Sequence, residues 1–290
     1  MKTILITGAT GQVGQEFQIL ADQFPDFNFI FAGKFELDIT NPQYVADFFR
    51  KHRFDYCVNC AAYTAVDKAE SEAEKAFALN VEGVRELAQS CLTRDIPLVH
   101  LSTDYVYHSQ PGRPFRESDK TNPQSVYART KLEGEQVALA IHPMTTVIRT
   151  SWVYSSFGHN FVKTMLRLAR ERDEIKVVSD QVGTPTYARD LARAILTMIQ
   201  KVDSEEVPSV HLRGIYHYSN EGETNWYEFA KAIFEMRGLD VRLSPITTAD
   251  FPTPALRPPY SVLDKSKIKT TFGIEIPDWK ESLRSCLELI

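Results

Sequence analysis

The sequence predicts an α/β protein built around a doubly wound parallel sheet, with a smaller C-terminal lobe. Two observations favour this fold class. In residues 1–150, short β-branched or apolar runs alternate with longer segments whose apolar residues recur at helical spacing. A glycine-rich turn, T-G-A-T-G-Q-V-G, follows the first of these runs directly and opens the first helical segment. Because parallel strands need right-handed helical crossovers, the alternation predicts a parallel sheet covered on both faces.

Each element of the first half has its own local signal. Strands are expected where β-branched or apolar residues cluster, at residues 3–7, 28–32, 56–61, 97–102 and 145–150. Helices are expected at residues 12–24, 42–52, 70–94 and 125–141. Pro42 suits the first turn of its helix, and Gly83 is a candidate to interrupt the long third helix.

The pattern changes after residue 150. Helices are expected at residues 160–171, 188–200, 225–237 and 279–289, and strands at residues 175–178 and 214–218. The stretch Thr253–Pro259 is rich in proline and predicts a loop. No linker-like segment separates the two halves, so we expect the C-terminal part to pack tightly against the first.

Composition and charge narrow the classes of function. The chain has 290 residues, 43% hydrophobic and 24% charged, which is typical of a soluble protein. Its net charge of -5 does not favour a nucleic-acid surface. No apolar run approaches the roughly 20 residues that span a bilayer, and the N-terminus enters a strand at once, without a signal peptide. We therefore expect a cytoplasmic protein with no membrane or nucleic-acid partner.

Two cysteines have the C-x-x-C spacing found in some redox and zinc sites, Cys57 and Cys60. They lie in an apolar run that predicts a buried strand, where residues three apart face opposite sides of the sheet. No second C-x-x-C and no nearby histidine completes a metal site. We interpret both as structural cysteines.

The glycine-rich turn predicts a dinucleotide-binding site. Glycines between the first strand and the first helix allow a sharp turn and a close approach of a pyrophosphate. The helix N-terminus adds free N–H groups and a positive dipole end. We therefore expect a Rossmann-type dinucleotide-binding domain at residues 1–150, to which later segments return, and a mainly substrate-binding lobe at residues 151–290. The residues expected at the turn are Gly8, Gly11, Gln12, Val13 and Gly14.

The end of the second strand indicates which dinucleotide is bound. An acidic residue there would favour NAD by binding the ribose 2′-hydroxyl, but the chain has Ala32, Gly33 and Lys34. Lys34 is placed to meet a 2′-phosphate, which favours NADPH and leaves NADH possible; a solvated loop lysine is nearly as good an interpretation. Further contacts to the dinucleotide are expected from Asp38, Ile39, Ala62, Tyr63 and Thr64.

A tyrosine and a lysine four residues apart supply candidate proton chemistry. Tyr127 and Lys131, in Y-A-R-T-K, lie on one face of the helix expected at residues 125–141. Reduction of a ketone needs a hydride at carbon and a proton at oxygen, and the Tyr127 phenol can supply the proton. We expect the Lys131 ammonium to lower the pKa of that phenol and to hold the nicotinamide ribose. Ser102 and Thr103 end the fourth strand, and Thr103 is the better candidate to orient the carbonyl oxygen.

These motifs resemble those of the extended short-chain dehydrogenases/reductases, and most closely those of the dTDP-4-dehydrorhamnose reductases. The similarity covers nearly the whole chain and includes T-G-x-x-G-Q-V-G, N-C-A-A-Y-T-A-V-D-K-A-E, L-S-T-D-Y-V-Y, V-Y-A-R-T-K-L-E-G-E, R-T-S-W-V-Y, D-Q-V-G-T-P-T and R-P-P-Y-S-V-L-D. It implies NADPH-dependent reduction of the C4 ketone of dTDP-4-dehydro-L-rhamnose, which makes dTDP-L-rhamnose for cell-surface polysaccharide. It also implies Tyr127 as proton donor, Lys131 as its partner and Thr103 as the residue that tunes it.

The resemblance further implies which residues meet the sugar nucleotide. Thr103, Asp104, Tyr127 and Trp152 are expected near the sugar, and Arg257 near the nucleotide or its diphosphate. A guanidinium fork suits a diphosphate, but loop packing explains Arg257 equally well. Trp152 can stack on a sugar or base, or it can fill the core between the two lobes.

The chain departs from the pattern of those family members that form a magnesium-bridged dimer. Glu16 matches one of the bridging glutamates, but Arg189 and Asp190 stand where another is expected. We predict no metal, and either a monomer or a homodimer. Two other functions stay open: another nucleotide-sugar epimerase or reductase of the same superfamily, and a non-catalytic regulatory subunit of methionine adenosyltransferase. The intact catalytic set favours an enzyme, and the missing acidic residue after the second strand favours a dissociable reductant.

Overall fold

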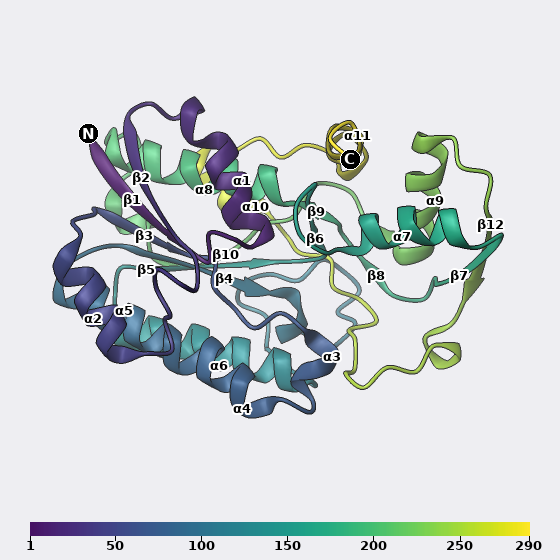
Figure 1. Cartoon of the computed structure of the whole chain (residues 1–290), viewed down its shortest axis with the longest axis horizontal. Helices are drawn as coiled ribbons and strands as arrows, with labels where there is room; N and C mark the ends of the chain where they lie inside the picture. The colour runs from purple at the N-terminus through teal and green to yellow at the C-terminus, as the bar shows by residue number, and fades with distance from the viewer.

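A six-stranded parallel sheet lies at the centre of the computed structural model, which describes residues 1–290 (Figure 1). Chain order runs outward from β1 to β2 and then back across β1 to β3, β4 and β5, which is the doubly wound arrangement that the sequence predicts. Ile4 and Ile6 face one side of the sheet and Leu5 the other, so both faces of β1 are buried. The strand order is β10 (Gly214–His217), β5 (Thr145–Thr150), β4 (Leu98–Thr103), β3 (Tyr56–Asn59), β1 (Lys2–Thr7) and β2 (Phe27–Ala32).

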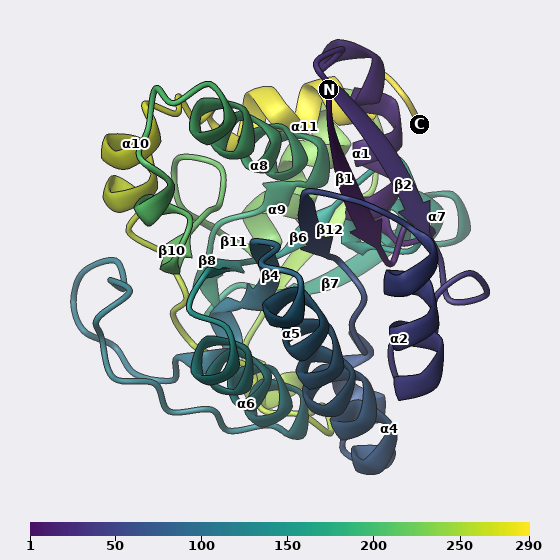
Figure 2. The same ribbon diagram turned by 90° about the vertical axis from the view of Figure 1, so that its left-hand side faces the viewer.

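Helices cover the sheet on both faces, as Figures 1 and 2 show. On one face lie α1 (Gln12–Leu20), α8 (Ala188–Asp203) and α10 (Ser266–Phe272), packed over a core of 24 buried residues. The opposite face carries α2 (Pro42–Lys51), α5 (Gly83–Thr93) and α6 (Val126–Ile141) over a core of 15 buried residues. The side chain of Asn41 caps α2 by accepting from two backbone N–H groups, and Pro42 occupies its first position.

Segments after residue 150 contribute to both parts of the molecule. Strand β10 extends the main sheet beside β5, and α8 packs against α1, so these segments return to the first part of the chain as expected. The remainder forms a lobe around 16 buried residues. Its helices are α7 (Phe161–Glu171), α9 (Trp226–Arg237) and α11 (Trp279–Leu287). Its strand pairs are β6 (Val153–Tyr154) with β9 (Thr186–Tyr187), β7 (Glu174–Val178) with β12 (Arg242–Ile246), and β8 (Val182–Gly183) with β11 (Thr224–Asn225).

The helix expected at residues 70–94 differs most from the prediction. It consists of α4 (Ala73–Phe77), a π-helical segment Ala78–Glu82 and α5, after a separate short helix α3 (Val66–Ala69). The π-helical segment ends just before Gly83, where an interruption was expected. Asn80 explains its position, because its buried side chain bonds the backbone of Tyr63 and the hydroxyl of Thr130. The widened turn therefore joins the loop after β3 to α6.

Other differences are small or concern short elements. Strand β3 ends at Asn59, two residues earlier than predicted. The N–H of Ala61 bonds Oδ1 of Asn59 instead of a neighbouring strand. The sequence analysis did not predict β6, β8, β9, β11 or α10, since two-residue strands and short helices carry almost no periodic signal. It also missed β12, a five-residue strand that contains Pro245. No helix has the length and apolar character needed to cross a bilayer.

The four cysteines are free thiols. Cys57 lies in the core beneath α2 and α5, whereas Cys60 packs against the core on the α1 side. The two therefore face opposite sides of the sheet, as their spacing predicts.

Candidate active site

The glycine-rich turn adopts a conformation that only glycine accommodates. Gly8 has φ +63°, and a Cβ there would lie 2.6 Å from the backbone nitrogen of Ala61. A Cβ on Gly14 would lie 2.5 Å from the carbonyl oxygen of Gly8, so α1 packs directly on the turn. No side chain caps α1, whose N-cap is Gly11. The first N–H groups of the helix are thus presented to the loop, which fits an anionic ligand such as a pyrophosphate.

A cavity of about 510 Å³ lies beside this turn. Seven of the residues expected to bind the dinucleotide line it: Gly8, Gly11, Lys34, Asp38, Ile39, Ala62 and Tyr63. Six expected residues do not line it, and two of these, Tyr127 and Lys131, were expected at the nicotinamide end and lie on α6. The other four have different surroundings. Gln12 accepts a hydrogen bond from Asn160, Val13 packs against the core, Gly14 is buried under the turn, and Thr64 is exposed. The sequence analysis missed eight lining residues, namely Thr10, Leu37, Thr40, Cys60, Ala61, Lys75, Ala78 and Leu79.

The charges around the cavity differ from the expectation in one respect. No carboxylate was expected at the end of the second strand, but the Glu36 side chain folds back and its Oε2 accepts from the N–H of Gly33 at 2.9 Å. Glu36 was overlooked because it stands four residues beyond the end of β2, and only the turn at Gly33 brings it back. Lys34 and Lys75 both line the cavity, although Nζ of Lys75 already pairs with Oε1 of Glu72 at 2.9 Å.

The candidate catalytic residues gather where α6 passes the end of β4. Ser125 caps α6 by accepting from the N–H of Ala128, which places Tyr127 in the first turn and Lys131 one turn later. The Lys131 side chain is 2% exposed and its Nζ donates to the carbonyl oxygen of Leu101 at 2.6 Å. Tyr127 is half-buried, and its ring meets the edge of Tyr105 at a centroid distance of 5.7 Å.

The pKa of Tyr127 shifts in the direction opposite to the expectation. Burial raises the pKa of Tyr127 to about 12; the Thr103 hydroxyl lowers it and the Asp104 charge raises it further. Burial also lowers the pKa of Lys131 to about 8, although Glu135 and Cys60 favour its charged form. The prediction that the Lys131 ammonium lowers the phenol pKa is therefore wrong for the chain by itself. The physical reason is that desolvation dominates at both groups, and the amine is directed at Leu101.

Asp104 presents an unpartnered carboxylate oxygen in this site. Its side chain is 2% exposed, and Oδ1 accepts from the Thr103 hydroxyl at 3.1 Å, whereas Oδ2 is buried without a partner. Burial raises the pKa of Asp104 to about 7, although hydroxyl groups of Ser261 and Thr103 partly offset the effect. A buried oxygen without a partner fits a hydroxyl group of a ligand.

The two other residues expected at the substrate are engaged within the chain. Trp152 has φ +48°, and its indole stacks on Trp226 with a centroid distance of 3.6 Å and an interplanar angle of 11°. One face of Trp152 is therefore covered. Arg257 forms a two-pronged ion pair with Asp67, with nitrogen–oxygen distances of 2.9 and 2.7 Å. The pair holds the pKa of Asp67 below its ordinary value.

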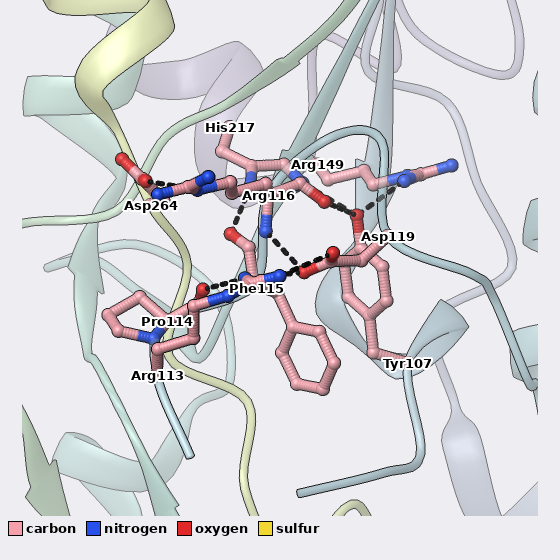
Figure 3. A network of polar contacts seen from close by, with 9 residues as sticks. All are labelled: Tyr107, Arg113, Pro114, Phe115, Arg116, Asp119, Arg149, His217 and Asp264. Atoms are coloured by element: carbon pink, nitrogen blue, oxygen red, sulfur yellow. Dashed lines mark hydrogen bonds and ion pairs between the residues drawn. The ribbon is translucent and has the colours of Figure 1, made fainter. Parts of the chain in front are cut away.

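A buried polar network behind α6 was missed by the sequence analysis (Figure 3). Arg149 donates from Nη1 to the Tyr107 hydroxyl at 2.6 Å, and its other nitrogens bond Glu135. The Tyr107 hydroxyl also lies 2.9 Å from Nε2 of His217. Glu135 follows Tyr127 by eight residues and so shares its helix face, which is a signal that could have identified it.

The same network holds the loop that follows β4. Nδ1 of His217 donates to the carbonyl oxygen of Phe115 at 3.1 Å, and Arg113 pairs with Asp119 at 2.8 Å. Arg116 lies 3.5 Å from Asp264, in the segment after the proline-rich loop. Figure 3 shows these side chains converging between the loop and β10. The loop is therefore anchored at several points beside the candidate site.

Glu16, which matched a bridging position in the resemblance, is fully buried. Its carboxylate accepts from the Ser155 hydroxyl at 2.6 Å and from Nε of Arg189 at 2.7 Å. Asp190 accepts instead from the side chain of Asn220. The Glu16 carboxylate thus joins α1 to the C-terminal lobe within one chain.

Comparison with known proteins agrees with this geometry. The family model described as the RmlD substrate binding domain matches residues 1–290. A dTDP-4-dehydrorhamnose reductase of Sinorhizobium fredii is 44% identical over 285 residues, which are 97% of this chain and 95% of that protein. A dTDP-4-dehydrorhamnose reductase of Aggregatibacter actinomycetemcomitans is 39% identical and covers 98% of both chains.

Solved structures give the same result. A dTDP-4-dehydrorhamnose reductase from Clostridium acetobutylicum superposes with a TM-score of 0.91 at 42% identity and covers 99% of each chain. The Bacillus anthracis dTDP-4-dehydrorhamnose reductase, solved in complex with NADP, also has a TM-score of 0.91, at 36% identity, with 99% of each chain covered. The chain therefore belongs to the RmlD family, the family of the dTDP-4-dehydrorhamnose reductases.

Proposed function

We propose that this chain reduces the C4 ketone of dTDP-4-dehydro-L-rhamnose to dTDP-L-rhamnose with NADPH, in the synthesis of cell-surface polysaccharide. One observation supports the proposal above the others. Tyr127, Lys131, Thr103 and Asp104 lie together at the end of β4, on the sheet edge that also carries the glycine-rich turn and its cavity. Ligands of doubly wound sheets bind at this edge.

Each residue has a defined part in the proposed reaction. When bound, the reduced nicotinamide supplies the hydride, which adds to C4 of the sugar. The Tyr127 hydroxyl donates its proton to the C4 oxygen, so that the C=O double bond becomes a C–O single bond with one new C–H and one new O–H bond. Thr103 orients that oxygen, and Lys131 holds the nicotinamide ribose. Solvent returns the proton to Tyr127.

The high pKa of Tyr127 suits this direction of the reaction. A phenol with a pKa of about 12 carries its proton throughout the neutral range. It therefore holds the proton that the C4 oxygen needs at neutral pH, whereas the tyrosinate that the reverse oxidation needs as a base is scarce there.

The two parts of the chain have different roles in the proposal. Residues 1–150, with the returning segments β10 and α8, bind the dinucleotide, and residues 151–290 mainly bind the sugar nucleotide. Asp104 and Trp152 contact the sugar. Arg257 meets the diphosphate by exchanging its contact with Asp67 for phosphate oxygens.

The proposal also covers the cofactor and the cellular setting. Lys34 at the cavity favours the 2′-phosphate of NADPH, and NADH remains a weaker donor. A net charge of -5 does not favour nucleic acid as a partner. We propose that the reaction takes place in the cytoplasm and that the protein is a monomer or a homodimer.

The absorbance of NADPH during turnover tests the proposal. Purified protein should oxidise NADPH with dTDP-4-dehydro-L-rhamnose, and more slowly with UDP- and GDP-linked analogues. Tyr127→Phe should bind NADPH normally and lose about 10²- to 10⁴-fold in kcat. Tyr44→Phe, on the exposed side of α2, is the matched control and should be unaffected. Near-normal turnover by Tyr127→Phe would reject the assigned chemistry. Tightly retained NAD with no net consumption of NADPH would indicate an epimerase instead.

A further inference from the structure

The one-turn helix α3 joins two distant parts of the chain at the candidate site. Asp67 on this helix holds the proline-rich loop, because its carboxylate accepts from the N–H of Ala255 at 3.2 Å and pairs with Arg257 at 2.7 Å. Glu70 follows the helix directly, and its Oε1 accepts from the N–H of Val126 at 2.8 Å, at the start of α6. Two carboxylates three residues apart therefore connect α3 both to the loop and to α6.

The bond from Val126 lies where α6 lacks hydrogen bonds of its own. The first four N–H groups of an α-helix have no partner within the helix. In α6 the Ser125 hydroxyl accepts from the N–H of Ala128, and the Glu70 carboxylate accepts from that of Val126. Tyr127 lies between these two residues, so side chains hold the backbone N–H groups on both sides of it. A carboxylate here also meets the positive end of the helix dipole.

The surroundings of Glu70 favour a local role at α6 over a role in the core. Its side chain is exposed and forms no ion pair, so the bond to Val126 is the polar contact that holds it in place. Glu74, four residues further along, is also exposed but makes no side-chain hydrogen bond or ion pair. The two glutamates thus differ in this contact, which makes Glu74 a matched control.

We propose that Glu70 is a positioning residue of the reductase, which holds the first turn of α6, and with it Tyr127, against the helix that carries the proline-rich loop. This inference rests on the proposed function, because the place of Tyr127 matters to turnover only if its phenol is the proton donor. The phenol must reach the C4 oxygen during hydride transfer, and a misplacement of about 1 Å can cost about 10²-fold in rate.

Asp67 supplies the link between α3 and the loop in this proposal. When Arg257 turns to the diphosphate, the N–H of Ala255 remains bonded to Asp67, since it takes no part in that exchange. α3 therefore stays attached to the loop in the free and the bound states. The loop that meets the sugar nucleotide and the turn that carries Tyr127 share one support.

Hydrogen exchange provides a test that does not depend on activity. The Val126 amide should be protected in the wild-type protein, although it belongs to a first helical turn. Glu70→Ala should speed its exchange about fivefold, which corresponds to a typical net hydrogen bond. Glu70→Gln should restore protection, because its Oε1 can accept the same N–H. A wild-type Val126 amide that exchanges as fast as an unbonded one would overturn the proposal.

Steady-state turnover provides the second test. Glu70→Ala should lower kcat about tenfold while the KM for NADPH stays within about twofold, because the dinucleotide cavity is untouched. Glu70→Gln should recover the wild-type kcat, since it keeps the hydrogen bond without the charge. Glu74→Ala should leave both constants unchanged.

A double-mutant cycle tests the link through α3. Asp67→Ala detaches the loop from α3, so it should lower kcat as well as raise the KM for the sugar nucleotide. If both carboxylates act through the same helix, their losses in kcat should not multiply when Asp67→Ala and Glu70→Ala are combined. Losses that multiply would show that α3 does not connect the loop to Tyr127, and would overturn that link.

The outcomes separate this proposal from the proposed function. A normal kcat in Glu70→Ala, with Tyr127→Phe inactive, would reject the role of Glu70 and leave the reductase assignment intact. An equal loss of kcat in Glu74→Ala, or no recovery in Glu70→Gln, would also reject that role. An active Tyr127→Phe would reject the proposed function itself.

Discussion

Arg149 and Glu135 form an ion pair in the interior, with Nη2 of Arg149 2.6 Å from Oε2 of Glu135 and the side chains 3% and 1% exposed. Nε of Arg149 makes further bonds to both carboxylate oxygens, and the Ser102 hydroxyl donates to Oε1. The pair joins β5 and β4 to the helix that carries Tyr127 and Lys131. Because every polar atom in the pair is engaged, the cost of burying the two charges is offset.

Removal of one charge from this pair should therefore be strongly destabilising. Glu135→Gln leaves the Arg149 guanidinium buried without a counter-charge, and we expect the free energy of unfolding to fall by about 3–5 kcal/mol. Chemical denaturation at neutral pH measures the change. Glu171→Gln removes the carboxylate of an exposed pair with Arg167 and should cost at most about 0.5 kcal/mol. Equal losses in the two variants would contradict the account of the buried pair.

The packing of α6 on the π-helical segment depends on Gly134. A Cβ at this position would overlap the carbonyl oxygen of Asn80. Gly134→Ala should push the helix away, with a loss of about 1–3 kcal/mol in stability and a lower kcat/KM, since Tyr127 and Lys131 move with it. Gln136→Ala, on the exposed face of the same helix, serves as the control in both the unfolding and turnover measurements. If Gly134→Ala kept wild-type stability and turnover, the close approach would be unimportant.

The raised pKa of Asp104 gives stability a particular pH dependence. The folded protein holds this proton up to about pH 7, whereas the unfolded chain releases it near the ordinary value of 3.8. Between these values the folded state binds more protons, so the contribution of Asp104 to stability is complete below about pH 4 and is lost as pH rises through 7. Asp104→Asn removes this dependence.

We thus compare the free energy of unfolding of Asp104→Asn with that of the wild type. The difference should shift in favour of the variant by about 2–4 kcal/mol between pH 4 and pH 8. Unfolding by denaturant at several pH values measures the difference. Asp26→Asn, at an exposed loop position, should show no such trend. A constant difference between Asp104→Asn and wild type across this range would show that Asp104 is not held protonated.

Lys34 should determine the preference between the two dinucleotides. Lys34→Asp places a negative charge at the cavity, so NADPH binding should weaken about tenfold more than NADH binding, which corresponds to about 1.4 kcal/mol. Titration with each dinucleotide measures the ratio of the dissociation constants. Lys51→Asp is the control, because it makes the same change of charge as Lys34→Asp but at the end of α2, outside the cavity lining. It should leave the ratio of the dissociation constants unchanged. An unaltered ratio in Lys34→Asp would show that this lysine does not meet the 2′-phosphate.

Local sequence was sufficient for the parts of this protein that depend on near neighbours along the chain. The alternation of strands and helices predicted the doubly wound sheet, because each element carries its own periodic pattern. The glycine-rich turn pointed to the cavity, and the four-residue spacing of Tyr127 and Lys131 pointed to α6 and its candidate catalytic residues, for the same reason. Each of these signals involves residues that are only a few positions apart in the sequence.

Only the tertiary structure decided what depends on residues distant in sequence. Examples are the π-helical turn held by Asn80, the return of Glu36 to Gly33, the pairing of Arg257 with Asp67 and the bond between Glu70 and Val126. The direction of the Tyr127 pKa shift belongs here too, because burial by several elements outweighs the charge one turn away. Spacing along a helix determines which side chains share a face. Desolvation and partner choice are properties of the whole packed interior, which no local pattern contains.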